Sequence, residues 1–208
     1  MPATEIQFAG LGGQGVILAG MTLGRGLALY EDYHVSLTQS FGPEARGSAC
    51  SVQLIVSPQP VHYPYVSRPH ILAALSQEAY RRFAPQLREG GLLLLEEDLV
   101  QANDLRADIR LYGVPATRLA EELGRKMVLN MVVVGFFTAV TGLLRPESAR
   151  RAVAESVPAG TDALNLAAFD KGYAYGLAQL AEAEPPGMRK DATVGFAGAG
   201  KNGINLYR

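Results

Sequence analysis

The segment FAGLGGQG, residues 8–15, decides the fold, because it follows the first apolar strand pattern of the chain and opens a helical one. Glycines at Gly10, Gly12 and Gly15 let the backbone turn tightly and bring free amide groups to the start of a helix, where an anion can bind. A dinucleotide site also needs an acidic residue at the end of the second strand, and that region reads VSLTQ, residues 35–39. The segment therefore predicts an anion-ready turn. The alternative is a turn that only lets the helix and the strand pack closely.

Strand patterns and helix patterns alternate along the rest of the chain. Strands are expected at residues 4–9, 33–39, 49–56, 71–75, 92–95 and 109–114. Helices are expected at residues 14–30, 77–87, 117–123, 130–143, 146–156 and 162–183. This alternation predicts an α/β fold with a doubly wound, mostly parallel sheet in a Rossmann-like three-layer arrangement.

Length and composition favour one domain followed by an arm. A chain of 208 residues can bury a substantial core, so residues 1–184 are expected to form a single α/β domain. The sequence Pro185-Pro186-Gly187 then ends helix formation, and residues 185–208 are rich in glycine. Because this stretch has apolar side chains to bury but no domain of its own, we expect an extended C-terminal arm that lies across a neighbouring subunit.

Charge and hydropathy exclude several classes of partner. The net charge of −1 offers no basic surface for nucleic acid. No apolar run reaches the roughly 20 residues that a membrane span needs. The first residues, MPATE, lack the basic and apolar regions of a signal peptide. The chain is therefore expected to be cytoplasmic, with no nucleic acid partner and no membrane span.

Cysteine and histidine usage argues against redox or metal chemistry within this chain. The single cysteine, Cys50, cannot form an internal disulfide or hold an iron–sulfur cluster, which needs about four thiolates. We expect it to be a buried structural thiol. The three histidines show no metal-ligand spacing, so no metal site is predicted.

A second dense turn, SFGPEARG at residues 40–47, follows the second expected strand. The guanidinium of Arg46 suits a phosphate or carboxylate, Glu44 can orient it, and Ser40 can donate or accept a hydrogen bond. Because ligands collect at the carboxyl ends of strands in open α/β sheets, we expect the two turns to face one crevice. The alternative is a Glu44–Arg46 pair that only shapes a surface loop.

These turns, with Leu129-Asn130-Met131 and AAFDKGYAYG at residues 167–176, resemble the γ subunit of the 2-oxoacid:acceptor (ferredoxin) oxidoreductases. Those enzymes use thiamine diphosphate and iron–sulfur clusters to oxidise 2-oxo acids to acyl-CoA. The resemblance runs from about residue 4 to about residue 180. One departure is Ser48, which follows Gly47 where the family usually has a further glycine.

The resemblance implies that this chain is a subunit of an enzyme and is not catalytically active by itself. It implies a coenzyme A site shared with other subunits, and thiamine diphosphate, Mg²⁺ and [4Fe-4S] clusters held by those partners. The implied partners are thiamine-binding α and β subunits and a ferredoxin-like iron–sulfur subunit, with a flavin subunit as an optional addition. No catalytic residue is assigned. The implied cofactor-binding residues are Gly10, Gly12, Gly13, Gln14, Gly15, Ser40, Glu44, Arg46, Gly47 and Asn130.

Two other functions stay open from the residues alone. One is a stand-alone Rossmann-type oxidoreductase that binds a nucleotide, and the other is a scaffold subunit without a ligand. An amide near a helix start, such as that of Asn130, is most often a helix cap or a polar contact on a packed face, and a ligand-facing amide is the alternative. The 2-oxo acid is also open: the resemblance favours 2-oxoglutarate, but pyruvate, branched-chain, indolepyruvate and phenylglyoxylate-type substrates remain.

Overall fold

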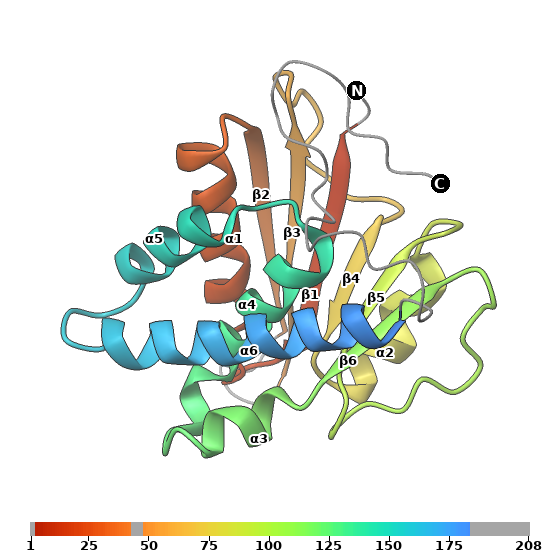
Figure 1. Cartoon of the computed structure of the whole chain (residues 1–208). Coiled ribbons are helices and arrows are strands. Elements are labelled where there is room, and N and C mark those ends of the chain that lie inside the picture. The colour runs from red at the N-terminus through yellow and green to blue at the C-terminus, as the bar shows by residue number, and fades with distance from the viewer. Residues whose placement is uncertain (1–2, 43–47, 184–208) are drawn as a thin grey trace.

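A six-stranded sheet runs through the centre of the computed structural model, which describes residues 3–42 and 48–183 (Figure 1). The strand order is β2-β3-β1-β4-β5-β6. The strands are β1 (Thr4–Leu11), β2 (His34–Phe41), β3 (Ala49–Ser57), β4 (Ile71–Ala74), β5 (Leu92–Glu96) and β6 (Arg110–Val114). The predicted site residues Glu44, Arg46 and Gly47 and the predicted arm, residues 185–208, lie outside the described residues.

The sheet is mostly parallel, as the sequence predicted, with one reversed strand. Strands β1, β4, β5 and β6 are parallel neighbours, whereas β3 pairs antiparallel with both β1 and β2. The reversal of β3 has a simple cause, because residues 42–48 are too few for the crossover of a dozen or more residues that a parallel pair needs. Consequently β2 runs in the same direction as β1, and the two strands end at the same edge.

Helices cover both faces of the sheet, which confirms the three-layer prediction. They are α1 (Val16–Tyr30), α2 (Gln77–Phe83), α3 (Ala116–Glu121), α4 (Leu129–Thr141), α5 (Pro146–Ser156) and α6 (Asp162–Ala183). Short 3-10 turns lie at η1 (Ala84–Gln86) and η2 (Lys126–Val128). The main core joins one sheet face to α1, α3, α4, α5 and α6, and α6 crosses the sheet in Figure 1. A smaller core lies under α2 on the other face. Among the described residues, no helix is long and apolar enough to span a membrane.

The two faces of β1, β2 and β3 differ sharply in polarity. One cross-strand row, formed by Leu37, Leu54 and Ile6, faces the main core. The next row along the same strands is Thr38, Gln53 and Gln7, and alternation places it on the α2 face. This half of the sheet is therefore apolar toward α1 and polar toward α2.

Helices α4 and α6 cross at unusually close range, through a pair of glycines. A Cβ atom added at Gly135 would lie 2.0 Å from the carbonyl oxygen of Phe169, and one at Gly172 would lie 1.9 Å from that of Val132. Only glycine fits these positions, because its missing side chain lets the two backbones touch. The crossing fixes α4, the helix that carries Asn130 toward the glycine turn.

Candidate functional site

The glycine turn and the described residues that flank the second turn, 40–42 and 48, share one edge of the sheet. The register aligns Phe41, Cys50 and Gly10 across β2, β3 and β1. The amide of Gly12 donates to the carbonyl of Ser48 at 2.9 Å, just before β3 begins. The end of β2, the start of β3 and the glycine turn therefore form one continuous edge, as expected from the sequence.

The side chain of Gln14 braces the glycine turn from within. Its Oε1 accepts a hydrogen bond from the amide of Leu11 at 2.7 Å, and its Nε2 donates to the carbonyl of Leu75 at 2.7 Å. A Cβ atom at Gly10 would lie 2.5 Å from that Oε1, so the bracing amide needs a glycine there. Both polar atoms of Gln14 are engaged inside the chain, and the residue therefore acts on the site by positioning the turn.

Helix α1 starts from Gly15, whose backbone has the left-handed angles φ 69° and ψ 22°. The N-cap residue Gly15 has no side chain to cap the helix, and the amide groups of any first helical turn lack a partner within the helix. Such groups, together with the helix dipole, favour an anion. The spacing of the glycines predicted this helix start correctly, and the binding of an anion there stays a prediction.

Asn130 packs directly against the glycine turn, although it is 115 residues away in sequence. It is only 3% exposed, and its Nδ2 donates to the carbonyl of Gly15 at 3.5 Å while its Oδ1 accepts from the amide of Met131 at 3.0 Å. A Cβ atom at Gly15 would lie 2.5 Å from Nδ2. Asn130 thus makes a polar contact on a packed face and holds α4 against the turn.

A cavity of about 450 Å³ opens beside this edge, between the sheet and α2. It is lined by residues from both turns, Gly10, Ser40 and Gly42, and by residues from α2 that sequence reasoning missed, among them Arg82 and Phe83. The sequence shows Arg81-Arg82 in a helical stretch, but which of the two arginines faces the turns depends on how α2 sits on the sheet. The cavity has the size of small-ligand sites.

Cys50 also lines this cavity, and it is half-buried, so it is less buried than the structural thiol that the sequence predicted. Burial raises the pKa of its thiol above the ordinary value. The thiol form therefore prevails near neutral pH, and the side chain packs against the main core. Among the described residues, no neighbouring charge lowers this pKa, so none of them activates Cys50 as a nucleophile.

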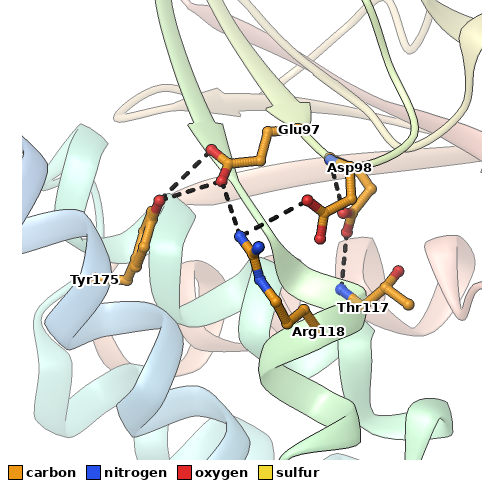
Figure 2. A network of polar contacts seen from close by, with 6 residues as sticks. Glu97, Asp98, Thr117, Arg118 and Tyr175 are labelled. Atoms are coloured by element: carbon orange, nitrogen blue, oxygen red, sulfur yellow. Dashed lines mark hydrogen bonds and ion pairs between the residues drawn. The ribbon is translucent and has the colours of Figure 1, made fainter.

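A second polar region lies at the carboxyl end of β5 (Figure 2). Glu97 accepts from the hydroxyl of Tyr175 at 3.3 Å and from Arg118 at 3.4 Å, and Arg118 also approaches Asp98 at 3.7 Å. These contacts join α3 and α6 to the sheet, and each charged group finds its partner inside the network. Within the described ranges, no cluster of His, Cys, Asp and Glu side chains could hold a metal ion.

Glu96 lies beneath that network and is fully buried. It accepts a hydrogen bond from the amide of Thr117 at 3.0 Å and another from that of Asp98 at 3.4 Å. Burial raises the pKa of its carboxyl group, although the two backbone bonds act in the opposite direction. Glu96 anchors the start of α3 to β5, which is a structural task.

The fold and this edge define an α/β subunit with an anion-ready helix start beside a ligand-sized cavity. The family described as "Pyruvate ferredoxin/flavodoxin oxidoreductase" matches residues 5–175, and the chain belongs to that family. It is of the gamma-subunit type of the 2-oxoacid:ferredoxin oxidoreductases, which confirms the resemblance read from the motifs.

Similar proteins agree with this assignment. "2-oxoglutarate synthase subunit KorC" of Methanocaldococcus jannaschii is 44% identical over 171 residues, covering 81% of this chain and 91% of that protein. A solved "keto/oxoacid ferredoxin oxidoreductase, gamma subunit" from Geobacter sulfurreducens is 35% identical with a TM-score of 0.76, covering 86% of this chain and 98% of that chain. The "2-oxoglutarate:ferredoxin oxidoreductase" from Magnetococcus marinus, solved "with 2-oxoglutarate, coenzyme A and succinyl-CoA bound", shares the fold with a TM-score of 0.78 at 21% identity. The structural match includes 86% of this chain and 32% of that longer polypeptide.

Proposed function

We propose that this chain is the gamma subunit of a thiamine-diphosphate and iron–sulfur oxidoreductase that oxidatively decarboxylates 2-oxoglutarate to an acyl-CoA. The observation that carries the choice of 2-oxo acid is the 44% identity to a 2-oxoglutarate synthase subunit over 91% of that protein. The reaction would take place in the cytoplasm, where a lone unpaired cysteine such as Cys50 is ordinary.

The redox chemistry belongs to partner subunits in this proposal. One cysteine in 208 residues cannot supply the four thiolates of a [4Fe-4S] cluster, so the clusters, like thiamine diphosphate and Mg²⁺, are assigned to other chains. The proposed partners are thiamine-binding α and β subunits and a ferredoxin-like iron–sulfur subunit, with a flavin subunit as an option. Support comes from the Magnetococcus marinus protein, where the same fold makes up 32% of a longer chain.

The contribution of this chain is proposed to be part of the coenzyme A site. The uncapped start of α1 after Gly15 offers amide groups and a positive helix end to a phosphate. Ser40 and Gly10 line the adjoining cavity, and Gln14 and Asn130 hold the glycine turn in place. Arg46, in the segment outside the described residues, would add a cation suited to a phosphate.

The test is steady-state kinetics of the enzyme reconstituted with its partner subunits. Arg46→Ala is expected to raise the KM for coenzyme A or lower kcat while the assembly stays intact. Arg110→Ala is the matched control, because Arg110 begins β6 at the opposite edge of the sheet and is exposed. Normal kinetics in Arg46→Ala would favour a scaffold subunit without a ligand.

Substrate choice is tested on the same preparation. Turnover with 2-oxoglutarate should exceed turnover with pyruvate at equal concentrations. A preference for pyruvate would retain the subunit assignment and refute the proposed substrate.

A further inference from the structure

Strand β2 forms one edge of the sheet, and one side of its backbone faces no other described strand (Figure 1). The amide of Gly42 donates to the carbonyl of Ala49 at 2.8 Å, so the alternation of an antiparallel pair fixes which residues of β2 bond to β3. These are the residues at even positions. The backbone groups of the residues between them point away from β3, namely Val35, Leu37, Gln39 and Phe41. Within residues 3–42 and 48–183, no hydrogen bond reaches these outward groups.

This edge lacks the features that usually prevent one sheet from pairing with another. Strand β2 reads HVSLTQSF, eight residues without a charged Lys, Arg, Asp or Glu and without a proline. Its register with β3 runs through eight consecutive pairs without a bulge. The opposite edge strand, β6, is shorter at five residues and begins at the exposed Arg110. Because short length, charge, proline and bulges protect sheet edges, β6 is protected and β2 is open to another strand.

Exposed apolar side chains lie beside the open edge. Phe41, at the end of β2, is 66% exposed. Gly24 of α1 lies over the same strand, since a Cβ atom there would lie 3.5 Å from Leu37 and 3.7 Å from Val35. Met21 precedes Gly24 by one helical turn on that flank of α1, and it is 47% exposed. Large apolar side chains beside an unpaired strand are typical of a surface that another protein covers.

The backbone of β2 is complementary to itself in one antiparallel register. A two-fold axis through Thr38 places the outward residues of one copy opposite the outward residues of a second copy. The pairs are Val35 with Phe41 and Leu37 with Gln39. All the outward backbone groups of both strands then form hydrogen bonds across the axis, which no other register achieves.

The side chains of β2 match in the same register. The exposed ring of Phe41 gains the β-branched Val35 of the second copy as its opposite neighbour, a favourable cross-strand pair. On the other face of the strand, hydroxyl groups meet, because Thr38 lies opposite its own copy and Ser36 lies opposite Ser40. Since β2 has no residue of fixed charge, no like charges meet at the axis. The surface therefore fits a second copy of itself.

We propose that β2 pairs with β2 of a second copy of this chain about this two-fold axis, which joins the two sheets into one. This inference goes beyond the proposed function and does not depend on it. Because the paired strands run in opposite directions, the glycine turns of the two copies lie at opposite edges of the joined sheet. The candidate site of each copy therefore stays open to other subunits.

Disulfide formation tests the register on the full chain, both alone and in the assembled enzyme. Thr38→Cys places two thiols opposite each other at the axis, where the Cβ atoms of a non-hydrogen-bonded pair are about 4.5 Å apart, within reach of a disulfide. Mild oxidation should convert most of this variant into a covalent homodimer on non-reducing electrophoresis. Ser36→Cys is the matched control on the same face, because its own copy lies about 13 Å away along the strand. It should give no covalent dimer, and neither should the wild type, whose only thiol is Cys50.

A second pair of variants tests the outward amides. Gln39→Pro removes an amide hydrogen that points away from β3, so the circular dichroism spectrum should stay that of the wild type. Each dimer loses two hydrogen bonds, and sedimentation velocity should show a dimer dissociation constant raised about 10-fold or more. Gln39→Ala retains the amide and should keep the dissociation constant of the wild type.

Four results would overturn the inference. A wild-type chain that stays monomeric at its highest soluble concentration would exclude the dimer. Cross-linking of Thr38→Cys no better than that of Ser36→Cys would refute the register. A disulfide from Thr38→Cys to a different subunit of the assembled enzyme would show that the edge receives a strand of another protein. Equal dissociation constants for Gln39→Pro and Gln39→Ala would show that the two copies do not pair through this backbone.

Discussion

Replacing Gly172 by alanine should separate helices α4 and α6, whose crossing fixes the position of Asn130 beside the glycine turn. The new Cβ would lie 1.9 Å from the carbonyl oxygen of Val132, whereas real Cβ atoms essentially never come closer than 3.0 Å to a neighbour. The obstacle is backbone in the middle of α4, which cannot rotate away. The helices must therefore separate by about 1 Å, and a gap of that size forfeits a quarter to a half of each dispersion contact along the crossing.

Two opposing effects decide how Gly172→Ala changes the free energy of unfolding: the overpacking at the crossing and the higher helix propensity of alanine. Overpacking of this kind costs about 1–3 kcal/mol or more, while alanine gains about 1 kcal/mol over glycine in a helix interior. We expect Gly172→Ala to lower the free energy of unfolding by about 2 kcal/mol. Because α4 holds Asn130 against Gly15, the glycine turn should also lose order.

Gly24→Ala in α1 is the matched control, since it has the same gain in helix propensity. Its Cβ would lie 3.2 Å from the flexible end of Leu54 and in ordinary contact with Leu37 at 3.5 Å and Val35 at 3.7 Å. The stability of Gly24→Ala should therefore stay near that of the wild type or rise slightly. Urea denaturation followed by circular dichroism measures both variants. Equal stability of Gly172→Ala and Gly24→Ala would refute the close backbone contact between α4 and α6.

Three further outcomes are expected. Gln7 is fully buried, and neither polar atom of its side-chain amide has a hydrogen-bond partner among the described residues. Gln7→Leu should therefore raise the free energy of unfolding, measured by urea denaturation, by about 1–2 kcal/mol. A loss of stability would show that Gln7 has a partner. Burial raises the pKa of the Glu96 carboxyl group, so the folded state binds the carboxyl proton more tightly than the unfolded chain does. The free energy of unfolding therefore falls as the pH rises above the pKa of Glu96 in the unfolded chain. Glu96→Gln should therefore gain stability relative to the wild type as the pH rises above about 4, and a difference that does not change with pH would contradict the assignment. Glu78→Gln removes a carboxylate from the cavity, so the KM for coenzyme A should fall about twofold, and a rise would argue against a phosphate there.

Much of the fold follows from local patterns. The boundaries of α5 and α6 agree with the sequence prediction, because a proline at the start of one and an uninterrupted helical stripe in the other act over a few residues. The segment expected as a helix at 77–87 instead divides into α2 and a 3-10 turn at Pro85, where the missing amide ends the regular pattern. The reversed β3 was not foreseen, although the short connection after β2 contained that information.

Parts of the candidate site could likewise be predicted from local sequence, whereas other parts depend on tertiary contacts. The glycine turn at residues 10–15 and its place at a helix start could be read directly, since backbone freedom and amide geometry are local properties. The bracing role of Gln14 could not, because its acceptor is the carbonyl of Leu75 on another strand. The contact of Asn130 with Gly15 likewise depends on how close α4 and α6 pack.

The sequence by itself determined the layers, the anion-ready turn and the absence of enough thiolates for a cluster, because each depends on residue type and spacing along the chain. Only the tertiary structure decided that the ends of β1 and β2 meet at one edge and that Arg82, not Arg81, faces the cavity there. The physical reason is that strand pairing and the rotation of a helix on a sheet are fixed by packing between segments far apart in sequence.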